Sequence, residues 1–409
     1  MYMIKNTTVG NVQFMQKYNR LKVLNLIRAR SVISRPEIIR ETGLSPSSVT
    51  NVISHFIEVN LVKELGPVDS KEVGRKAVQI KFNADAFAII AVELDPEQVS
   101  IAITNMDGTI LKKQKLQIPS SLANQEILDL TRREIVAIIS HGKDSLPIIR
   151  GIGIAVSGAV NNSDELVISS SLKWRGVSIR DYYEKAFSIP TFVENSSKTK
   201  VRYKFSESDS NPEKNVVFLD LSSGIGLVNF YKGKINQTIT GEIGHTSVKK
   251  DGPLCFCGNK GCMELMCSVQ NIVSEVEKLL ANGKCEILKE LLSKDAAPDY
   301  PAILQAEKAA DKDVCRVIRK NGEYLGIGIA NIVNLFNPDR IIINGDLLFR
   351  SELLAKTAVN ISRERSFKDF VKNTEIETIT ISDDDAIRGL SLNVADNLFE
   401  LDDLDFGAD

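Results

Sequence analysis

The stretch "GEIGHTSVKKDGPLCFCGNKGCME", residues 241–264, contains a dense set of potential metal ligands. It holds one of the three histidines and three of the six cysteines in the 409-residue chain. His245, Cys255, Cys257 and Cys262 follow the spacing H-x9-C-x-C-x4-C. Three thiolates and one imidazole form a closed tetrahedral set for Zn²⁺, with no position left for a reactive water. The spacing predicts a structural zinc site; the alternative is a group of reduced buried thiols beside a loop histidine.

The other three cysteines, Cys267, Cys285 and Cys315, have no ligand-like spacing. We expect them to be small core residues, because a free cysteine behaves as a small apolar side chain.

Length and composition indicate a globular protein with two or three domains. A chain of 409 residues exceeds one ordinary hydrophobic core, and 43% of the residues are hydrophobic and 25% charged. The sequence contains no signal-peptide pattern and no apolar run of membrane-spanning length. The cysteines do not resemble a secreted disulfide framework. We therefore expect a cytoplasmic protein with no membrane partner.

Charge is distributed unevenly along the chain. Residues 1–82 contain 13 Lys and Arg against six Asp and Glu, a net charge of about +7, and the remainder carries about −9. A basic head on an acidic body indicates that the head binds a polyanion. Chance surface charge is the alternative explanation.

Residues 34–58 carry the start and stop signals of two short helices. Ser34 and Glu37 form a capping-box pattern, and Gly43 is placed where a helix ends. Ser45 then precedes Pro46, a typical cap followed by proline at the first helical position. The second helix has an apolar stripe at helical spacing. The stripe consists of Val49, Val52, Ile53, Phe56 and Ile57.

Two short helices joined by a tight turn predict a helix-turn-helix. The sequence that follows predicts a β-hairpin wing, with Gly74, Arg75 and Lys76 near its tip. The helix front would read the major groove and the wing the minor groove. A helical interaction module with a solvated polar face is the alternative. The candidate DNA-binding residues are Arg35, Ser45, Ser47, Ser48, Thr50, Asn51, His55, Arg75 and Lys76.

The rest of the chain predicts an α/β protein with mixed sheets. Residues 88–117 are typical of an antiparallel meander, and a helix is expected over residues 126–140. Residues 269–336 are expected to be mostly helical, and "RIIINGD" predicts a further strand.

The cysteine loop, "SLKWRGVSIRDYYEKAFSIPTFVEN" and "YLGIGIANIVNLFNPDRIIINGD" together resemble the ROK family of repressors, open reading frames and sugar kinases. The resemblance spans nearly the whole chain, and a winged helix ahead of these motifs is typical of the family's repressor branch, which includes xylose- and N-acetylglucosamine-responsive regulators. It implies a two-lobed, actin-like sugar-kinase fold whose last helix returns to the first lobe. The expected domains are a winged helix-turn-helix at 1–82, lobe I at 83–200 and 386–409, and lobe II at 201–385 with the zinc loop and dimerisation helices.

The resemblance also implies site residues. Similar proteins bind zinc with the four positions of the cysteine loop, and they hold a sugar with the positions that are Asn195, Glu242, His245 and Glu264 in this chain. Gly158 is a further candidate that would offer its backbone to the sugar. Without the resemblance, the sequence favours ordinary surface acids at Glu242 and Glu264.

The phosphate-transfer elements of the family's kinases are altered in this sequence. Ser196 stands where those kinases have the aspartate that accepts the proton of the attacking hydroxyl. The first phosphate loop is changed as well, since Pro96 lacks an amide donor and Glu97 would repel a polyphosphate. The second loop persists partly as "SSGIG", residues 222–226, and the adenosine-side motif is reduced to "NGD", residues 344–346. We therefore expect no catalytic residues and no kinase activity.

These expectations combine into a sugar-responsive transcriptional repressor of a carbohydrate-utilisation operon. It would bind operator DNA as a homodimer, with a tetramer also possible, and a sugar or sugar phosphate as effector. It would lie on the bacterial nucleoid when bound to its operator. The alternatives are a ROK sugar kinase with an appended DNA-binding domain, and a constitutive DNA-binding protein with a vestigial cleft.

Overall fold

The structure is a computed structural model that describes residues 12–67, 78–119, 121–141, 146–161, 165–207, 214–222, 224–293, 296–345 and 350–400. The expected wing-tip residues Gly74, Arg75 and Lys76 lie outside the described residues, as does Asp346 of the "NGD" motif. In the described part of the chain, no helix combines the length and the apolar character needed to cross a membrane.

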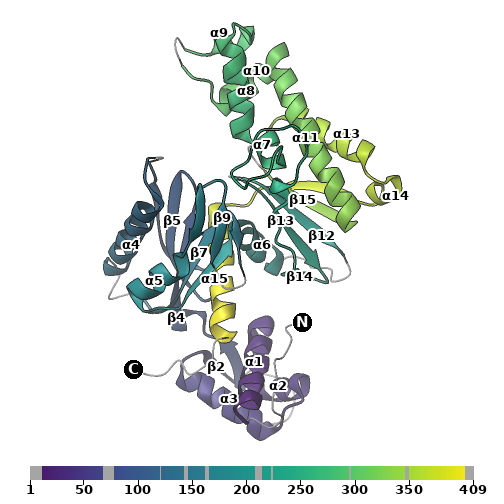
Figure 1. Ribbon diagram of the computed structural model, residues 1–409. Helices are drawn as coiled ribbons and strands as arrows, with labels where there is room; N and C mark the ends of the chain where they lie inside the picture. The colour runs from purple at the N-terminus through teal and green to yellow at the C-terminus, as the bar shows by residue number, and fades with distance from the viewer. Residues whose placement is uncertain are drawn as a thin grey trace.

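The N-terminal head contains three helices and a small antiparallel sheet (Figure 1). The helices are α1 (Val12–Arg30), α2 (Arg35–Thr42) and α3 (Pro46–Glu58). Strands β1 (Val32–Ser34), β3 (Val78–Phe82) and β2 (Val62–Pro67) form the sheet in that order. A turn between α2 and α3 followed by the β2–β3 pair is the arrangement of a winged helix-turn-helix.

The predicted caps of α2 and α3 are confirmed. The backbone N–H of Ser34 donates to Glu37 Oε2 at 2.8 Å, and Gly43 ends α2 in the left-handed region at φ 69°. The hydroxyl of Ser45 accepts from the backbone N–H of Ser48 at 3.2 Å. These contacts satisfy backbone groups that the helices leave unpaired at their ends.

Two features of the head differ from the sequence analysis. Helix α1 was not expected, and it supplies Val23, Leu24 and Ile27 to the core of the head. Ile57 was expected in the buried stripe of α3, but its side chain is 40% exposed, and that part of the prediction is wrong. The physical reason is that successive residues are about 100° apart around a helix, so Ile57 lies roughly 80° from Val49, at the edge of the face that buries Ile53 and Phe56.

The first large sheet has the order β11-β7-β4-β5-β6. Strands β4 (Phe87–Leu94), β5 (Gln98–Asn105) and β6 (Ile110–Gln117) form the predicted antiparallel meander. Strands β7 (Ile148–Val156) and β11 (Thr191–Asn195) run parallel to β4. Helices α4 (Asn124–Ser140) and α5 (Ile179–Phe187) cover one face, and α15 (Asp383–Glu400) packs on the other beside α6 (Ser196–Glu207).

A smaller sheet, β10-β9-β8, lies next to the first large sheet. It consists of β8 (Ala159–Val160), β9 (Leu166–Ser169) and β10 (Trp174–Val177).

The second large sheet has the order β14-β13-β12-β15-β16. Its strands are β12 (Val216–Leu221), β13 (Ile225–Tyr231), β14 (Lys234–Ile235), β15 (Arg340–Asn344) and β16 (Glu375–Ile379). A helical layer covers one face of this sheet and extends away from the head (Figure 1). Its members are α7 (Met263–Cys267), α8 (Val269–Ala281), α9 (Glu286–Leu291), α10 (Tyr300–Lys308), α11 (Lys312–Phe336), α13 (Glu352–Arg365) and α14 (Lys368–Val371).

Helix α15 packs against its neighbours at positions where only glycine fits. A Cβ atom at Gly153 of β7 would lie 2.6 Å from Val394 Cγ2. A Cβ atom at Gly389 would lie 1.9 Å from the carbonyl oxygen of Thr199 on α6. The glycine in β7 therefore serves close packing of the returning helix.

The end of α15 also enters the core of the head, as Figure 1 shows where the helix reaches α1. Phe399 packs edge-to-face on Phe82 at 6.2 Å between ring centroids, and the Arg28 guanidinium of α1 lies 5.0 Å from the Phe399 ring. One helix therefore contacts the first large sheet, α6 and the head.

We predict that Gly389→Ala lowers the free energy of unfolding by about 1–3 kcal/mol, because the added methyl group must displace the backbone of α6. The reduction should exceed any gain from the higher helix propensity of alanine. Urea unfolding followed by circular dichroism measures this change. Glu400→Ala, at the exposed end of the same helix, is the matched control, and equal midpoint shifts in the two variants would contradict the contact.

Candidate functional site

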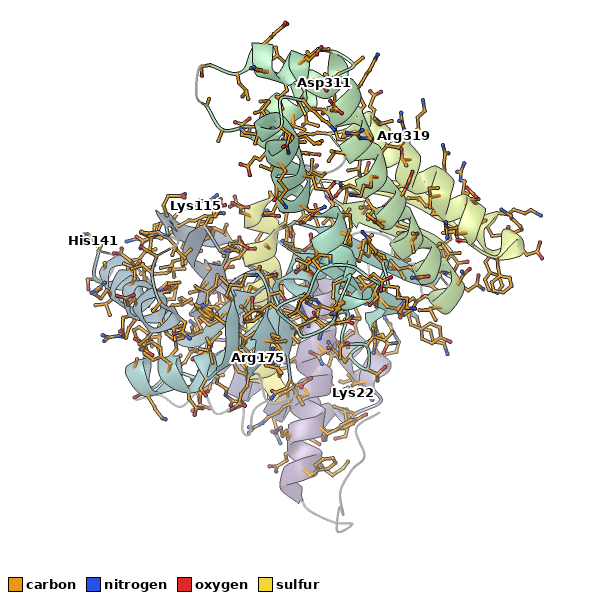
Figure 2. All side chains as sticks on the ribbon, turned by 45° about the horizontal axis from the view of Figure 1, so that its top comes forward. Lys22, Lys115, His141, Arg175, Asp311 and Arg319 are labelled. Carbon is orange, nitrogen blue, oxygen red and sulfur yellow. The ribbon has the colours of Figure 1, made fainter. Side chains whose placement is uncertain are left out.

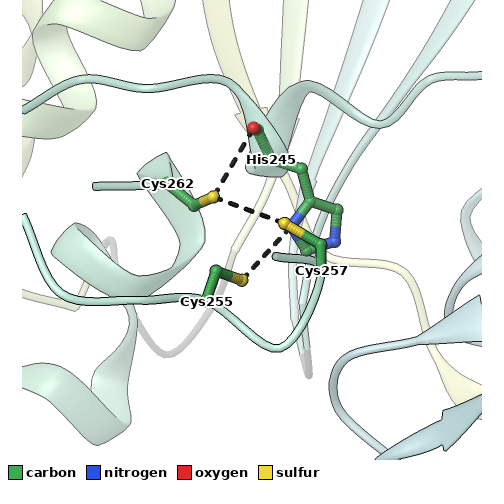
Figure 3. Close-up of side chains that lie close together, drawn as sticks. All are labelled: His245, Cys255, Cys257 and Cys262. Atoms are coloured by element: carbon green, nitrogen blue, oxygen red, sulfur yellow. Dashed lines mark hydrogen bonds between the residues drawn. The ribbon is translucent and has the colours of Figure 1, made fainter. Parts of the chain in front are cut away.

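The predicted metal ligands meet in one loop. His245 ends the short helix η2 (Ile243–His245), Cys255 and Cys257 lie on the following loop, and Cys262 precedes α7 (Figure 3). One ligand atom from each of the four residues lies within 4.8 Å of the others. The sequence prediction that these four side chains form a group able to hold a metal ion is thus supported by their geometry.

The distances inside this group suit a tetrahedral ion. Cys257 Sγ lies 3.7 Å from Cys262 Sγ, and Cys255 Sγ lies 3.7 Å from His245 Nδ1. In a tetrahedron with Zn–S bonds of about 2.3 Å and a Zn–N bond of about 2.0 Å, the edges are roughly 3.5–3.8 Å. Three sulfurs and one ring nitrogen are also the donors that zinc prefers. Residues and spacing both fit zinc.

The backbone of the loop holds the ligands in place. The Cys255 N–H donates to the Asn259 carbonyl at 2.7 Å, and Asn259 Nδ2 donates to the His245 carbonyl at 3.0 Å. Gly261 has φ 66°, and a Cβ atom there would lie 1.7 Å from the Lys249 carbonyl oxygen. Only glycine suits this turn, which lies immediately before Cys262.

The other cysteines have different surroundings. Cys267 and Cys285 are fully buried in the core of the second large sheet, as expected, whereas Cys315 is only partly buried. Cys285 also lies near Asp311 and Asp313. Asp311, labelled in Figure 2, accepts hydrogen bonds from the backbone of α9 and α11. This second group is therefore accounted for by helix capping.

All five predicted sugar-site residues line one small polar cavity beside the metal group. They are Gly158, Asn195, Glu242, His245 and Glu264. The cavity has a volume of about 20 Å³, which is space for about one water molecule. Further lining residues that the sequence analysis missed are Ser157, Ser170, Ser171, Ser197, Asp220, Ser222, Gly224, Ile225 and Gly226.

His245 connects the metal group to this cavity. Its Nδ1 faces Cys255 Sγ, while its Nε2 lies 3.3 Å from Ser170 Oγ and 3.7 Å from Glu242 Oε2. When Nδ1 binds a metal ion, Nε2 carries the ring proton and donates it toward the cavity. The metal would therefore fix both the tautomer and the direction of this donor.

The two glutamates of the loop point into the same space. Glu264 follows Cys262 on α7, and its Oε2 accepts the backbone N–H of Ile225 at 2.9 Å. Burial, and then the nearby Glu264 carboxylate, raise the pKa of Glu242 to about 7. Adjacent carboxylates of this kind accept hydrogen bonds from neighbouring hydroxyl groups.

Asn195 links the cavity to α6. Its Nδ2 donates to the Gly158 carbonyl at 2.8 Å, and its Oδ1 accepts the Ser197 backbone N–H at 2.8 Å, which caps α6. Ser196, which the sequence analysis expected at the position of the kinase aspartate, is 5% exposed and lines the cavity. A ligand that displaces Asn195 would therefore act directly on the start of α6.

Comparison with known proteins agrees with this architecture. The sequence pattern of the ROK family matches residues 89–396. The chain is 28% identical over 347 residues to a xylose repressor from Bacillus spizizenii, covering 83% of this chain and 85% of that protein. It is 25% identical over 390 residues to the DNA-binding transcriptional dual regulator NagC from Escherichia coli, covering 94% of each.

A solved structure gives the same fold. The crystal structure of a ROK family transcriptional regulator, a homologue of the E. coli MLC protein, aligns with a TM-score of 0.76 at 23% identity. The alignment covers 94% of this chain and 97% of that one, so the fold likeness includes the N-terminal head. With the family pattern matched over three quarters of its length, this chain belongs to the ROK family.

Proposed function

We propose that this protein is a sugar-responsive transcriptional repressor that binds operator DNA through its head and a sugar in the polar cavity. The names of its relatives, a xylose repressor and NagC, support this proposal. The observation that carries it is a contact path from the cavity to the head, in which Asp396 bridges Arg28 and Arg202.

The exposed face of α3 suits an approach to DNA. Ser47, Thr50, Asn51 and Ser54 are exposed and His55 partly so. Side chains of this type donate and accept hydrogen bonds at base edges and phosphates without repelling them. Arg35 is held by Glu64 at 2.8 Å, so a phosphate would have to compete with that carboxylate. A two-fold symmetric dimer on a roughly palindromic operator would follow from paired half-sites.

The small volume of the cavity makes sugar binding a conformational event. A space of about 20 Å³ accommodates about one water molecule, so a sugar requires the cavity to open. A ligand that binds only an altered state shifts the population of states by its differential affinity. Sugar binding in this cavity would therefore change the conformation of its lining, and the elements packed against that lining would be displaced.

Helix α6 would transmit this change. It begins at Ser196, next to Asn195 in the cavity, and it contacts α15 closely at Thr199 and Gly389. Further along α6, Arg202 donates to Asp396 Oδ2 at 3.0 Å. The other oxygen of Asp396 accepts from Arg28 of the head at 2.8 Å. A shift of α6 would thus act on α1 through one carboxylate.

We propose further that the cavity does not catalyse phosphoryl transfer. Ser196 is a poor proton acceptor near neutral pH, and losing a positioned base costs about 10²–10⁴ in rate. The resemblance implies that Pro96 and Glu97 lie in the first phosphate loop. Pro96 lacks a backbone N–H donor, and the carboxylate of Glu97 would repel a phosphate group.

The first prediction concerns sugar and DNA together. With a DNA site selected from a random library, one member of a panel of xylose, glucose, N-acetylglucosamine and their phosphate esters should change DNA affinity by about 5–150-fold. Glu242→Gln should weaken binding of that sugar by about tenfold, because it removes a charged acceptor. Fluorescence anisotropy for DNA and calorimetry for sugar measure both quantities.

Glu290→Gln, on the exposed surface of α9, is the control for this experiment and should behave as the parent protein. No response to any sugar would favour a constitutive DNA-binding protein. ATP-dependent phosphorylation of a sugar would favour the kinase.

The second prediction isolates the contact path. Asp396→Asn should keep its affinity for DNA and for the sugar, but the sugar-induced change in DNA affinity should fall by about threefold to tenfold. Glu400→Gln at the end of the same helix is the control. An unchanged sugar response in Asp396→Asn would remove the bridge from the mechanism.

The third prediction concerns the metal. The protein should bind one Zn²⁺ per chain in the four-residue group, and Co²⁺ in its place should give the absorption of a tetrahedral thiolate complex. Cys257→Ser should lose metal and sugar binding while the head still binds DNA. Cys315→Ser, outside the group, should retain all three properties. Full sugar affinity in metal-free Cys257→Ser would contradict the positioning role of the metal.

A further inference from the structure

A second and much larger cavity lies between the two large sheets. Its volume is about 570 Å³. It is lined by the β4–β5 turn, the ends of β12 and β15, the start of α8 and the segment that leads into α15. The resemblance to ROK kinases implies that their first phosphate loop and adenosine-side motif correspond to residues 96–97 and 344–345 in this lining, where the side chains have a different chemistry.

The charged side chains that line this cavity are mostly acidic. Glu93, Asp95, Glu97 and Asp383 line it, with Lys200 as the cationic member among the described residues. Lys200 already donates to Asp220 Oδ2 at 3.1 Å and to Ser222 Oγ at 2.9 Å. Asp383 is paired with Lys115, labelled in Figure 2 beside the start of α15. The described charges therefore leave the cavity with an excess of negative charge, which excludes a polyphosphate.

Glu93 is the most buried of these acids, and one of its two carboxyl oxygens has no hydrogen-bond partner among the described residues. Its side chain is 4% exposed, and the oxygen without a partner is Oε2. Burial raises the pKa of Glu93 to about 7; the Lys200 ammonium acts against this rise, and the carboxylates of Asp95 and Asp383 add to it. A buried carboxyl group without a partner is costly unless a ligand supplies one.

The spacing of the carboxylates argues against a metal ion. A divalent cation needs several oxygen ligands at about 2.0–2.6 Å, so the oxygens must lie close to one another. Among the described residues, the groups of three or more potential ligand atoms within 4.8 Å are the His245 group and the Cys285 group, and neither includes a residue of this cavity. Charges that lie further apart suit a ligand with separated positive centres.

Apolar side chains lie between the acidic ones. Pro96, Leu221, Val269 and Ile381 line the same cavity. Apolar walls with carboxylates at intervals match an aliphatic chain that carries two or more ammonium groups. Each terminal ammonium group has three N–H donors for carboxylate acceptors, and the methylene groups between the ammonium groups would pack on the apolar residues.

We propose that this cavity is a binding site for an aliphatic polyamine, with Glu93 as the most buried acceptor and Glu97 as an acceptor at the rim. The site adjoins the sugar cavity, since Ser222 lines both, but its occupancy can be measured without sugar or DNA. A bound polyamine would contact both sheets and lie next to Lys200 of α6.

Calorimetry with the full-length, zinc-loaded protein tests this proposal, with spermidine and 1,4-diaminobutane as probes at constant ionic strength. We expect saturable binding of one spermidine per chain, weaker binding of the diamine, and no detectable binding of butylamine or ATP. Glu93→Gln should weaken spermidine binding by about tenfold or more, because it removes the charge of a buried acceptor.

Glu97→Gln, at an exposed position, should weaken spermidine binding by about threefold to tenfold. Glu290→Gln is the surface control and should bind as the parent protein does. Equal spermidine affinity in all three variants, or the absence of saturable binding to the parent, would overturn the proposal. The proposal would also be overturned if the parent protein bound Mg²⁺ or ATP with a stoichiometry of one per chain and Glu97→Gln changed that affinity.

Discussion

The close packing of α15 is the constraint on which the rest of this structure depends. At Gly153 and Gly389 there is no room for a single methyl group, so the helix is fixed against β7 and α6. Close-packed elements of this kind transmit displacement because they cannot be compressed. The same helix carries Phe399 into the core of the head. A movement of α6 relative to the first sheet would therefore be passed on to the head.

The metal group and the small cavity form one unit around His245. Its Nδ1 faces the cysteines, and its Nε2 faces Ser170 and Glu242. A closed ligand set leaves no open position for catalysis, so an ion there would shape the cavity instead of reacting. The larger cavity between the sheets is lined by Glu93, Glu97 and Pro96, whose side chains supply no hydrogen-bond donor for a phosphate group when the two glutamates are ionised.

Local sequence signals predicted much of this structure. The capping pattern of Ser34 and Gly43 and the cysteine spacing depend on residues a few positions apart, and both are borne out by the geometry. Contacts between distant residues were not predictable in this way. Arg28 and Asp396 are 368 positions apart, and Arg35 was expected at DNA but is paired with Glu64. Helix α1 was missed because its buried residues become recognisable as a core only once α3 and β3 cover them.

The central claim is that sugar binding and operator binding to this protein are thermodynamically coupled. Linkage requires that each ligand change the affinity of the other by the same factor. Calorimetric titration of the effector sugar into the free protein and into the protein–operator complex measures this factor directly. We predict that the two sugar affinities differ by the factor, about 5–150-fold, by which the sugar changes operator affinity. Equal sugar affinity in the presence and absence of operator would contradict the account.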